Sequence, residues 1–316
     1  MSGPSFVVWG DGPWGRALSR RLASGGANVA LIGLRTSNRK LPRGIVHSTD
    51  LASALGSCER VLVALPVTAL EAALTDAARH FEGHHRVVLT SRGLTSRGLS
   101  SAEVPQRASE VLMQRTCVRQ FAVLAGASDA TTLDQGRAAS LVVASAFPSW
   151  SQELQAALAG PTLRVYTSVD PIGVELSNAI AVVLAVALGV AHAKDATSAT
   201  RATALTRAVA EMDRLVRRFG GTAGTAFGLA GLGVLSTLVF DASGPPFDAG
   251  SALCRGDLLE AQAQTELRAA AAALSARARI AGVSAPLVDT VHELFEGRQS
   301  ADEALTMLMS RAARSE

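Results

Sequence analysis

The stretch that decides the fold is FVVWGDGPWG, residues 6–15. Its first four residues are β-branched or aromatic, which is typical of a buried strand, and residues 16–24 have the composition of a helix. Gly10, Gly12 and Gly15 form the pattern Gly-x-Gly-x-x-Gly between these two elements. In this context the first glycine permits a tight turn, the second lets a pyrophosphate approach the backbone, and the third lets the helix pack closely. The stretch therefore predicts a dinucleotide-binding type of α/β domain.

Two residues inside the glycine loop weaken the prediction of a bound ligand. Pro13 has no N–H to donate to a phosphate oxygen, and Asp11 places a negative charge where an anion is expected to bind. The fold and the ligand are therefore separate predictions. The residues that we expect to contact a dinucleotide are Gly10, Gly12, Trp14, Gly15 and Arg35.

The segment after the second predicted strand, residues 29–32, contains no acidic residue that accepts a ribose 2′-hydroxyl. It is basic instead, and two interpretations stay open. The first is a site for the 2′-phosphate of a dinucleotide, which favours NADP over NAD. The second is an ordinary solvated loop. The side chains concerned are Arg35, Ser37, Arg39 and Lys40.

The rest of the chain divides into an alternating half and a helical half. Further runs of apolar, β-branched residues alternate with helix-length segments, which predicts a Rossmann-type doubly wound parallel sheet over residues 1–169. Asp170-Pro171 is a strong helix start, and helical periodicity without a strand follows to the C-terminus. We therefore expect an all-α domain over residues 170–316. The later predicted strands are residues 61–64, 87–90, 122–124, 141–144 and 163–167.

Composition excludes several classes of protein. The chain has 316 residues, of which 48% are hydrophobic and 18% are charged, so disorder and a small disulfide scaffold are excluded. Its net charge of +3 is scattered, which argues against nucleic acid as a partner. Cys58, Cys117 and Cys254 lie far apart and show no metal-ligand spacing, as expected in a reducing compartment.

The apolar run at residues 176–191 is the strongest candidate for a membrane span. It contains Ser177 and Asn178 and is shorter than the roughly 20 residues that a spanning helix needs. The N-terminus has no basic segment before its first apolar run, which argues against a signal peptide. We expect a buried core helix, no membrane partner and a cytoplasmic protein.

Several segments, in order, resemble the bacterial NAD(P)-dependent glycerol-3-phosphate dehydrogenases over nearly the full chain. The resemblance implies a Rossmann domain, a helical substrate domain, NAD or NADP as cofactor, often a homodimer, and hydride exchange between sn-glycerol 3-phosphate and dihydroxyacetone phosphate. The segments that carry it are GDGPWGRAL (10–18), VLVALPVTAL (61–70), SRGL (91–94), VLAGASDA (123–130), VYTSVDPIGVEL (165–176), LTRAVAEM (205–212), GLAGLG (228–233) and GVSAPLVDTVHELFEGRQSADEALTMLMSR (282–311).

The same resemblance implies that the polar residues of the family's active site are changed. The lysine of its Lys-Gly loop falls on Arg92, and its acid/base lysine and the next asparagine fall on Ala181 and Val182. The aspartate after Gly-Leu-Ala-Gly-Leu-Gly falls on Val234, and the Ser-Arg-Asn segment that grips the substrate phosphate falls on 243–245, Ser-Gly-Pro. Alanine and valine cannot take a hydroxyl proton, and Gly-Pro offers at most one N–H to a phosphate. We predict that no residue in the family's catalytic positions is competent.

Other polar side chains stay open as replacements in the substrate cleft. Ser177 and Asn178 share a helix face with position 181, and Glu175 lies near them; the three either act on a substrate or serve packing and capping. Arg207 either forms an i,i+4 ion pair with Glu211 or faces the cleft. Three further residues carry less weight. His192 lies about 16 Å along the helix from position 181, Lys194 lies on the opposite face, and Glu266 is followed by Leu267 where the family has glycine.

Three functions are consistent with these residues. The first is a glycerol-3-phosphate dehydrogenase-like protein without that activity, kept for a binding or regulatory role or for a protein partner. The second is an NAD(P)-dependent dehydrogenase that acts on another CH–OH substrate through Arg92 and residues 177–178. The third is glycerol-3-phosphate dehydrogenase activity through Arg92 or Arg97, which belong to the repeated pentapeptide TSRGL at residues 90–94 and 95–99. The bland interpretation of that repeat is a local duplication in a loop.

Overall fold

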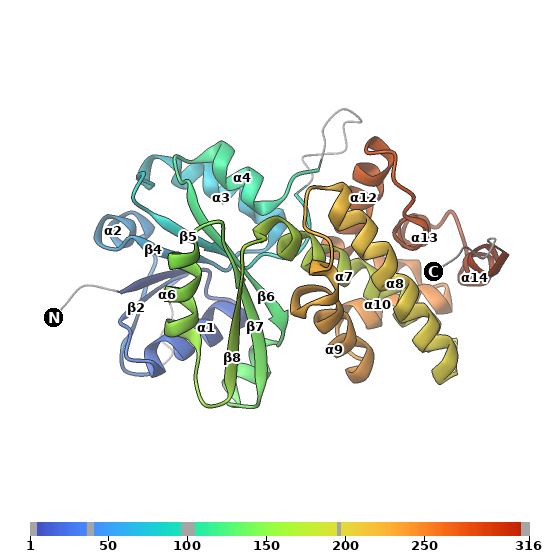
Figure 1. Cartoon of the computed structure of the whole chain (residues 1–316), viewed down its shortest axis with the longest axis horizontal. Coiled ribbons are helices and arrows are strands. Elements are labelled where there is room, and N and C mark those ends of the chain that lie inside the picture. The colour runs from blue at the N-terminus through green and yellow to red at the C-terminus, as the bar shows by residue number, and fades with distance from the viewer. Residues whose placement is uncertain (1–4, 37–40, 96–104, 195–196, 311–316) are drawn as a thin grey trace. The chain divides into compact units, whose positions relative to one another are not determined.

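The computed structural model describes residues 5–36, 41–95, 105–194 and 197–310. It divides into two compact units, coloured from blue to red along the chain in Figure 1. The first consists of Met1–Thr95 and Gln106–Glu175, and the second of Ser96–Pro105 and Leu176–Glu316. The first is an α/β unit and the second is helical, so the predicted fold class is confirmed.

The first unit contains an eight-stranded sheet with the order β3-β2-β1-β4-β5-β6-β7-β8. From β1 the chain builds outward to β2 and β3, and it then returns to β4 on the other side of β1. The order of the strands therefore reverses between β1 and β4, and ligands of doubly wound folds bind beyond the carboxyl ends of the strands at such a switch point. The strands are β1 (Phe6–Trp9), β2 (Val29–Ile32), β3 (Ile45–Ser48), β4 (Arg60–Val63), β5 (Arg86–Leu89), β6 (Gln120–Ala127), β7 (Ala139–Ala144) and β8 (Leu163–Ser168).

Two features of the sheet differ from the sequence prediction. Strand β7 runs antiparallel to β6, although all strands were expected to be parallel. Only the five-residue helix α5 (Ala130–Asp134) lies between them, and a parallel crossover needs a dozen residues or more. The edge strand β3 was not predicted. It is short and half exposed, with Val46 70% exposed, so it lacks the apolar run that marks the buried strands.

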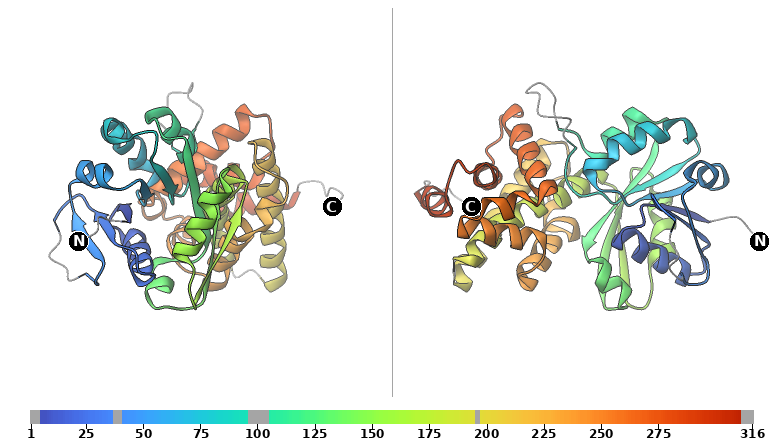
Figure 2. Two further views of the ribbon diagram at one scale, coloured as in Figure 1. Left: turned by 60° about the vertical axis from the view of Figure 1, so that its left-hand side comes forward. Right: turned by 180° about the vertical axis from the view of Figure 1, so that it is seen from behind.

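Side chains alternate between the two faces of the sheet. Helices lie on both faces of the sheet (Figure 2). Helices α1 (Pro13–Ser24) and α6 (Pro148–Leu158) pack on the face that includes Phe6 and Val8. On the face of Val7 and Trp9 the core is completed by α2 (Leu51–Ser57), α3 (Val67–Ala77) and α4 (Ala108–Arg115). A short 3-10 helix, η1 (Ala78–His80), follows α3.

The second unit contains helices and no strand in the residues that the structure describes. Its central helix α7 (Pro171–Ala193) begins where Asp170 Oδ1 accepts the N–H of Gly173 at 2.8 Å, as the Asp-Pro start predicts. The elements after it are α8 (Ser198–Arg218), η2 (Thr225–Phe227), η3 (Leu229–Gly233), α9 (Val234–Asp241), α10 (Pro245–Arg255), α11 (Leu258–Gln262), α12 (Thr265–Ile280), α13 (Pro286–Phe295) and α14 (Ala301–Ser310).

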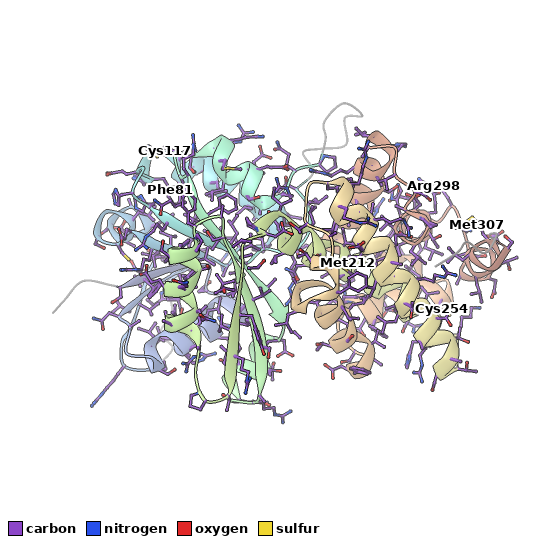
Figure 3. The ribbon with its side chains drawn as sticks, viewed as in Figure 1. Phe81, Cys117, Met212, Cys254, Arg298 and Met307 are labelled. Carbon is purple, nitrogen blue, oxygen red and sulfur yellow. The ribbon has the colours of Figure 1, made fainter. Side chains whose placement is uncertain are left out.

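Glycines allow close contacts within the helical unit. A Cβ at Gly250 of α10 would lie 2.5 Å from the carbonyl oxygen of Val186 in α7, so only glycine fits at this helix crossing. A Cβ at Gly231 in η3 would lie 2.8 Å from the Sδ of Met212, a core residue labelled in Figure 3. Helix α7 is long and apolar enough to cross a membrane, but 83% of its most apolar window is buried inside the structure, as in a core helix.

Candidate functional site

The glycine loop has the geometry that a dinucleotide needs. A Cβ at Gly10, where φ is +119°, would lie 2.4 Å from the carbonyl oxygen of Ala64, and a Cβ at Gly15 would lie 1.8 Å from the carbonyl oxygen of Gly10. These two positions are closed, and each requires glycine. Nothing lies within 4 Å of a Cβ built at Gly12, so the backbone there is open to a ligand. The loop therefore keeps the open central glycine that a pyrophosphate approaches.

Helix α1 begins at this loop with Gly12 as its N-cap and Pro13 at its first position. The first amides of a helix have no acceptor within it, so those of Trp14 and Gly15 remain as donors after the proline. Trp14 is partly buried against the core of the α1 face. Pro13 thus removes one donor and leaves the next two.

Another helix of this protein also begins with proline, and its first amides bind a carboxylate that belongs to the protein itself. Pro286 is the first residue of α13, and the amides of Leu287 and Val288 donate to the Glu211 carboxylate at 3.0 Å. A proline at the first helical position is therefore compatible with an anion on the two amides that follow. By the same arrangement α1 can hold a phosphate on Trp14 and Gly15, and the loop fits a dinucleotide.

The end of β2 is only partly described. Arg35 is exposed, whereas Ser37, Arg39 and Lys40, the other candidates for a 2′-phosphate site, lie outside the described residues. Asp11 reaches this region from the glycine loop: its Oδ2 lies 3.3 Å from Nε2 of His47 on β3. The sequence did not predict a role for His47, because strand β3 was not predicted and a single histidine forms no recognisable motif.

Arg92 lies in the loop after β5, in the first copy of the repeated pentapeptide. Ser91 Oγ donates to the carbonyl of Leu65 at 2.8 Å, and the Arg92 guanidinium approaches the carbonyl of Ser128 at 3.5 Å. The Arg92 side chain is exposed; nearby protein atoms lower its pKa, Asp129 raises it, and arginine stays charged in either case. Arg92 can therefore present a fixed positive charge but cannot act as a base. Arg97, in the second copy, lies outside the described residues.

The carboxylate of Glu175 is bound by other side chains of the first unit. Its carboxylate accepts hydrogen bonds from the N–H and Oγ of Ser109 and lies 3.4 Å from the Arg107 guanidinium. Burial raises the pKa of Glu175, while Arg107 and Ser109 lower it. Arg107 also pairs with Glu110 at the start of α4. This buried cluster makes Glu175 a cap of α4 and leaves it no role as a free base in a cleft.

On α7 the expected cleft residues are buried. Ser177 and Ala181 are fully buried, Asn178 is 2% exposed, and Val182 is partly buried. Ser177 Oγ and Asn178 Oδ1 have no hydrogen-bond partner among the described atoms. Besides Glu175, the ionisable side chain of α7 is His192, whose Nδ1 lies 3.1 Å from the Arg201 guanidinium. The middle of α7 thus carries no group that can take a proton.

The segment that the resemblance places at the family's phosphate clamp, residues 243–245, leads into the start of α10. Gly244, with φ of +92°, is the N-cap, and Pro245 and Pro246 occupy the first two helical positions. Two of the first three helical amides are therefore missing, and Asp248 adds a negative charge in the first turn. Val234, the first residue of α9, is buried. A phosphate finds few donors at this helix start.

The expected ion pair between Arg207 and Glu211 is not formed. Glu211 turns to the start of α13, and the cation near it is Arg214, at 3.8 Å. Burial raises the pKa of Glu211 to about 7, against the lowering effect of the Leu287 and Val288 amides. Arg207 is exposed on α8. Glu211 does not pair with Arg207 because the N-terminus of α13 binds its carboxylate more strongly than a solvated arginine one turn away.

Two remaining candidates, Lys194 and Glu266, lie in surroundings that indicate a structural role. Lys194 pairs with Asp302 at 2.7 Å, and Glu266 is exposed in the first turn of α12, where it is followed by the buried Leu267. Lys194 and Lys40 are the two lysines of the chain, and Lys40 lies outside the described residues. Within the described part of the chain, no three His, Cys, Asp or Glu side chains are placed to hold a metal ion.

Comparison with known proteins agrees with this geometry. A family model described as the NAD-dependent glycerol-3-phosphate dehydrogenase N-terminus matches residues 34–151, and one described as the C-terminus of the same enzyme matches residues 170–306. A glycerol-3-phosphate dehydrogenase (NAD(P)+) of Sphingopyxis alaskensis is 33% identical, with 99% of this chain and 98% of that relative covered. The chain belongs to the NAD-dependent glycerol-3-phosphate dehydrogenase family. Its first unit has the NAD(P)-binding fold of that family.

Solved structures of glycerol-3-phosphate dehydrogenases have the same two-unit architecture as this family member. The enzyme of Coxiella burnetii, 27% identical, superposes with a TM-score of 0.86 and covers 98% of this chain and 100% of that one. The yeast enzyme is 17% identical with a TM-score of 0.83, and 97% of this chain and 99% of the yeast chain are covered, so that likeness concerns the fold. The fold is therefore kept at low sequence identity, and the activity has to be argued from the residues of this chain.

Proposed function

We propose that this family member binds a nicotinamide dinucleotide and does not catalyse the oxidation of glycerol 3-phosphate. The single observation that carries the proposal is the centre of α7, where Ala181 is fully buried; the resemblance places the family's acid/base lysine at this position. Hydride transfer from a secondary alcohol requires a group that takes the hydroxyl proton, and loss of such a group lowers the rate by about 10²- to 10⁴-fold.

Nearby ionisable groups do not replace that lysine. Glu175 is held by Ser109 and Arg107, and Lys194 is paired with Asp302 about 20 Å further along the helix. Arg92 keeps a positive charge but does not exchange its proton at physiological pH. The proton acceptor for glycerol-3-phosphate oxidation is thus missing on α7.

The start of α10 supports the same conclusion for substrate binding. A phosphate dianion requires several N–H donors or arginine and lysine side chains. Gly244 precedes two prolines there, and Asp248 repels an anion. Loss of the proton acceptor and of the phosphate site together supports a binding or regulatory role for the protein, alone, as a homodimer, or with a protein partner.

The test has two parts on one preparation. Titration with NADH and NADPH, followed by energy transfer from tryptophan, is expected to show saturable binding, because Trp14 lies in the loop that the dinucleotide contacts. An assay with sn-glycerol 3-phosphate and either NAD or NADP is expected to show no turnover. Gly12→Val is the control for the binding signal, since its side chain fills the open position. Turnover that Gly12→Val abolishes would refute the proposal.

A second function is favoured by one observation. Ser177 Oγ and Asn178 Oδ1 are buried without partners one turn from Ala181, and an unpaired buried polar atom carries a cost of about 1–3 kcal/mol that a ligand can relieve. This supports an NAD(P)-dependent dehydrogenase that acts on a less polar alcohol or ketone. A screen of unphosphorylated alcohols and ketones with wild type and Asn178→Leu tests it. Turnover that is lost in Asn178→Leu would support this function, and its absence from a broad panel would count against it.

A further inference from the structure

The carboxylate of Asp11 lies over the end of β2. A Cβ at Gly33, the residue directly after that strand, would lie 2.5 Å from Asp11 Oδ2 and 2.7 Å from its Cγ. The same Cβ would lie 2.7 Å from His47 Nε2. Asp11 and His47 therefore fill the space that a side chain at position 33 would take, and the glycine is what admits them.

This place has a defined role in doubly wound dinucleotide folds. The pyrophosphate lies on the loop after β1, and the adenosine ribose lies at the end of β2, where an acidic residue accepts its 2′-hydroxyl. Residues 33–36, which directly follow β2, are Gly-Leu-Arg-Thr and supply no carboxylate. Asp11 brings one to the same place from the glycine loop. We propose that Asp11 recognises the ribose 2′-hydroxyl and makes this protein select NAD(H) over NADP(H).

The surroundings of Asp11 hold its carboxylate in place and leave it accessible. His47 Nε2 lies 3.3 Å from Oδ2, and the His47 side chain is only 9% exposed, so the ring is a fixed support. Arg16 donates to the main-chain carbonyl of Asp11 and ties the loop to α1. The Asp11 side chain itself is 37% exposed, so a ligand hydroxyl can reach it.

The selectivity follows from charge. A ribose 2′-hydroxyl donates a hydrogen bond to the carboxylate, whereas the 2′-phosphate of NADP(H) brings about two negative charges against it. The basic residues after β2, which are Arg35, Arg39 and Lys40, act in the opposite direction and attract a 2′-phosphate; Arg35 is exposed, and solvent screens its charge. His47 holds the Asp11 carboxylate at the end of β2, and this fixed position favours its effect over that of the exposed Arg35. Recognition of the ribose thus explains why the loop contains Asp11, although its negative charge disfavours the pyrophosphate.

The inference rests on the proposed dinucleotide binding, and its test compares two ligand pairs. Dissociation constants are measured for NADH against NADPH, and for ADP-ribose against ADP-ribose 2′-phosphate, which lack the nicotinamide. Wild type is expected to bind the ligands without 2′-phosphate about tenfold more tightly or better, the effect of one charged hydrogen bond. Asp11→Asn is expected to reduce that ratio to about threefold or less, mainly by tighter binding of the phosphorylated ligands.

The matched control is Asp134→Asn in α5, which removes an equal charge from an ion pair with Arg20 of α1 and is expected to keep the wild-type ratio. Asp11→Ser replaces Asp11→Asn if that variant does not fold. A wild-type preference for NADPH, or a ratio unchanged by the Asp11 substitutions, would overturn the inference while binding itself upholds the proposed function. Absence of binding of all four ligands to every variant would overturn both.

Discussion

Two helices of this protein, both candidate anion sites, begin with the same dipeptide, Gly-Pro. At the start of α1, Gly12 and Pro13 are followed by the free amides of Trp14 and Gly15. At the start of α10, Gly244 and Pro245 are followed by a second proline, and an aspartate stands in the first turn. The first helix start keeps two consecutive donors and the second does not.

Helix α13 shows that this difference matters. It also begins with proline, and its second and third amides hold the Glu211 carboxylate. A single proline at a helix start is therefore compatible with a carboxylate on the next two amides, whereas a second proline removes one of those two donors. The comparison teaches that the start of α1 keeps two consecutive amide donors, whereas the start of α10 lacks one of them because of its second proline and carries an aspartate.

The largest expected effect is on the stability of the glycine loop. Gly15→Ala places a Cβ 1.8 Å from the carbonyl oxygen of Gly10, so the loop must move, and we expect a loss of about 3 kcal/mol or more of unfolding free energy. Gly12→Ala, whose Cβ meets nothing within 4 Å, is expected to stay within about 1 kcal/mol of wild type. Urea unfolding of both variants measures the difference. Equal losses would show that the loop is not packed as described.

The next effect concerns Glu211, whose carboxylate accepts hydrogen bonds from the first amides of α13. Because the pKa of Glu211 is raised to about 7, folding takes up a proton between the ordinary value of 4.5 and 7. Stability from this group is therefore present below pH 4.5 and is lost as pH rises through 7, by about 3 kcal/mol in all. Glu211→Gln removes this titration, and its unfolding free energy is expected to fall less than that of wild type between pH 5 and 7.5. Parallel pH profiles for the two proteins would contradict the assignment.

A smaller effect separates ligand binding from stability in the glycine loop. Gly12→Ala puts a methyl group where the pyrophosphate approaches and is expected to weaken NADH binding about tenfold or more. Isothermal titration of folded protein measures it. The control is Gly56→Ala in α2, which also meets open space but lies outside the loop, so its affinity is expected to equal that of wild type. Unchanged affinity in Gly12→Ala would remove α1 as the pyrophosphate site.

The smallest effect is a gain. Pro13→Ala restores one N–H at the start of α1, and one hydrogen bond of about 1 kcal/mol corresponds to about fivefold tighter NADH binding. The matched change at α10, Pro246→Ala, is expected to leave binding of glycerol 3-phosphate undetectable, because one donor beside Asp248 does not make a phosphate site. Titration of each ligand against its variant checks both statements. Weaker NADH binding by Pro13→Ala would show that the ring, and not its missing donor, matters.

The sequence predicted the elements whose signals are local. The buried strands, the glycine loop and the Asp170 cap were each marked by a short run of residues, and the structure has them where they were expected. The direction of β7 and the edge strand β3 depend on connection length and on sheet pairing, which no local pattern records. For the same reason the contact of Asp11 with His47 could not be predicted: it joins the glycine loop to strand β3, which the sheet brings together. The partner of Glu211 is 76 residues away in the chain, so the i,i+4 spacing to Arg207 pointed to the wrong one.

The most direct test of the account is a single-turnover measurement. Protein saturated with NADH is mixed with dihydroxyacetone phosphate, and the fluorescence of the bound nicotinamide is followed with protein and cofactor in equal amounts. The account predicts that the cofactor binds and that its fluorescence stays constant after mixing, because α7 supplies no proton and α10 holds no phosphate. A loss of fluorescence equivalent to one turnover per bound cofactor, with glycerol 3-phosphate formed, would contradict it.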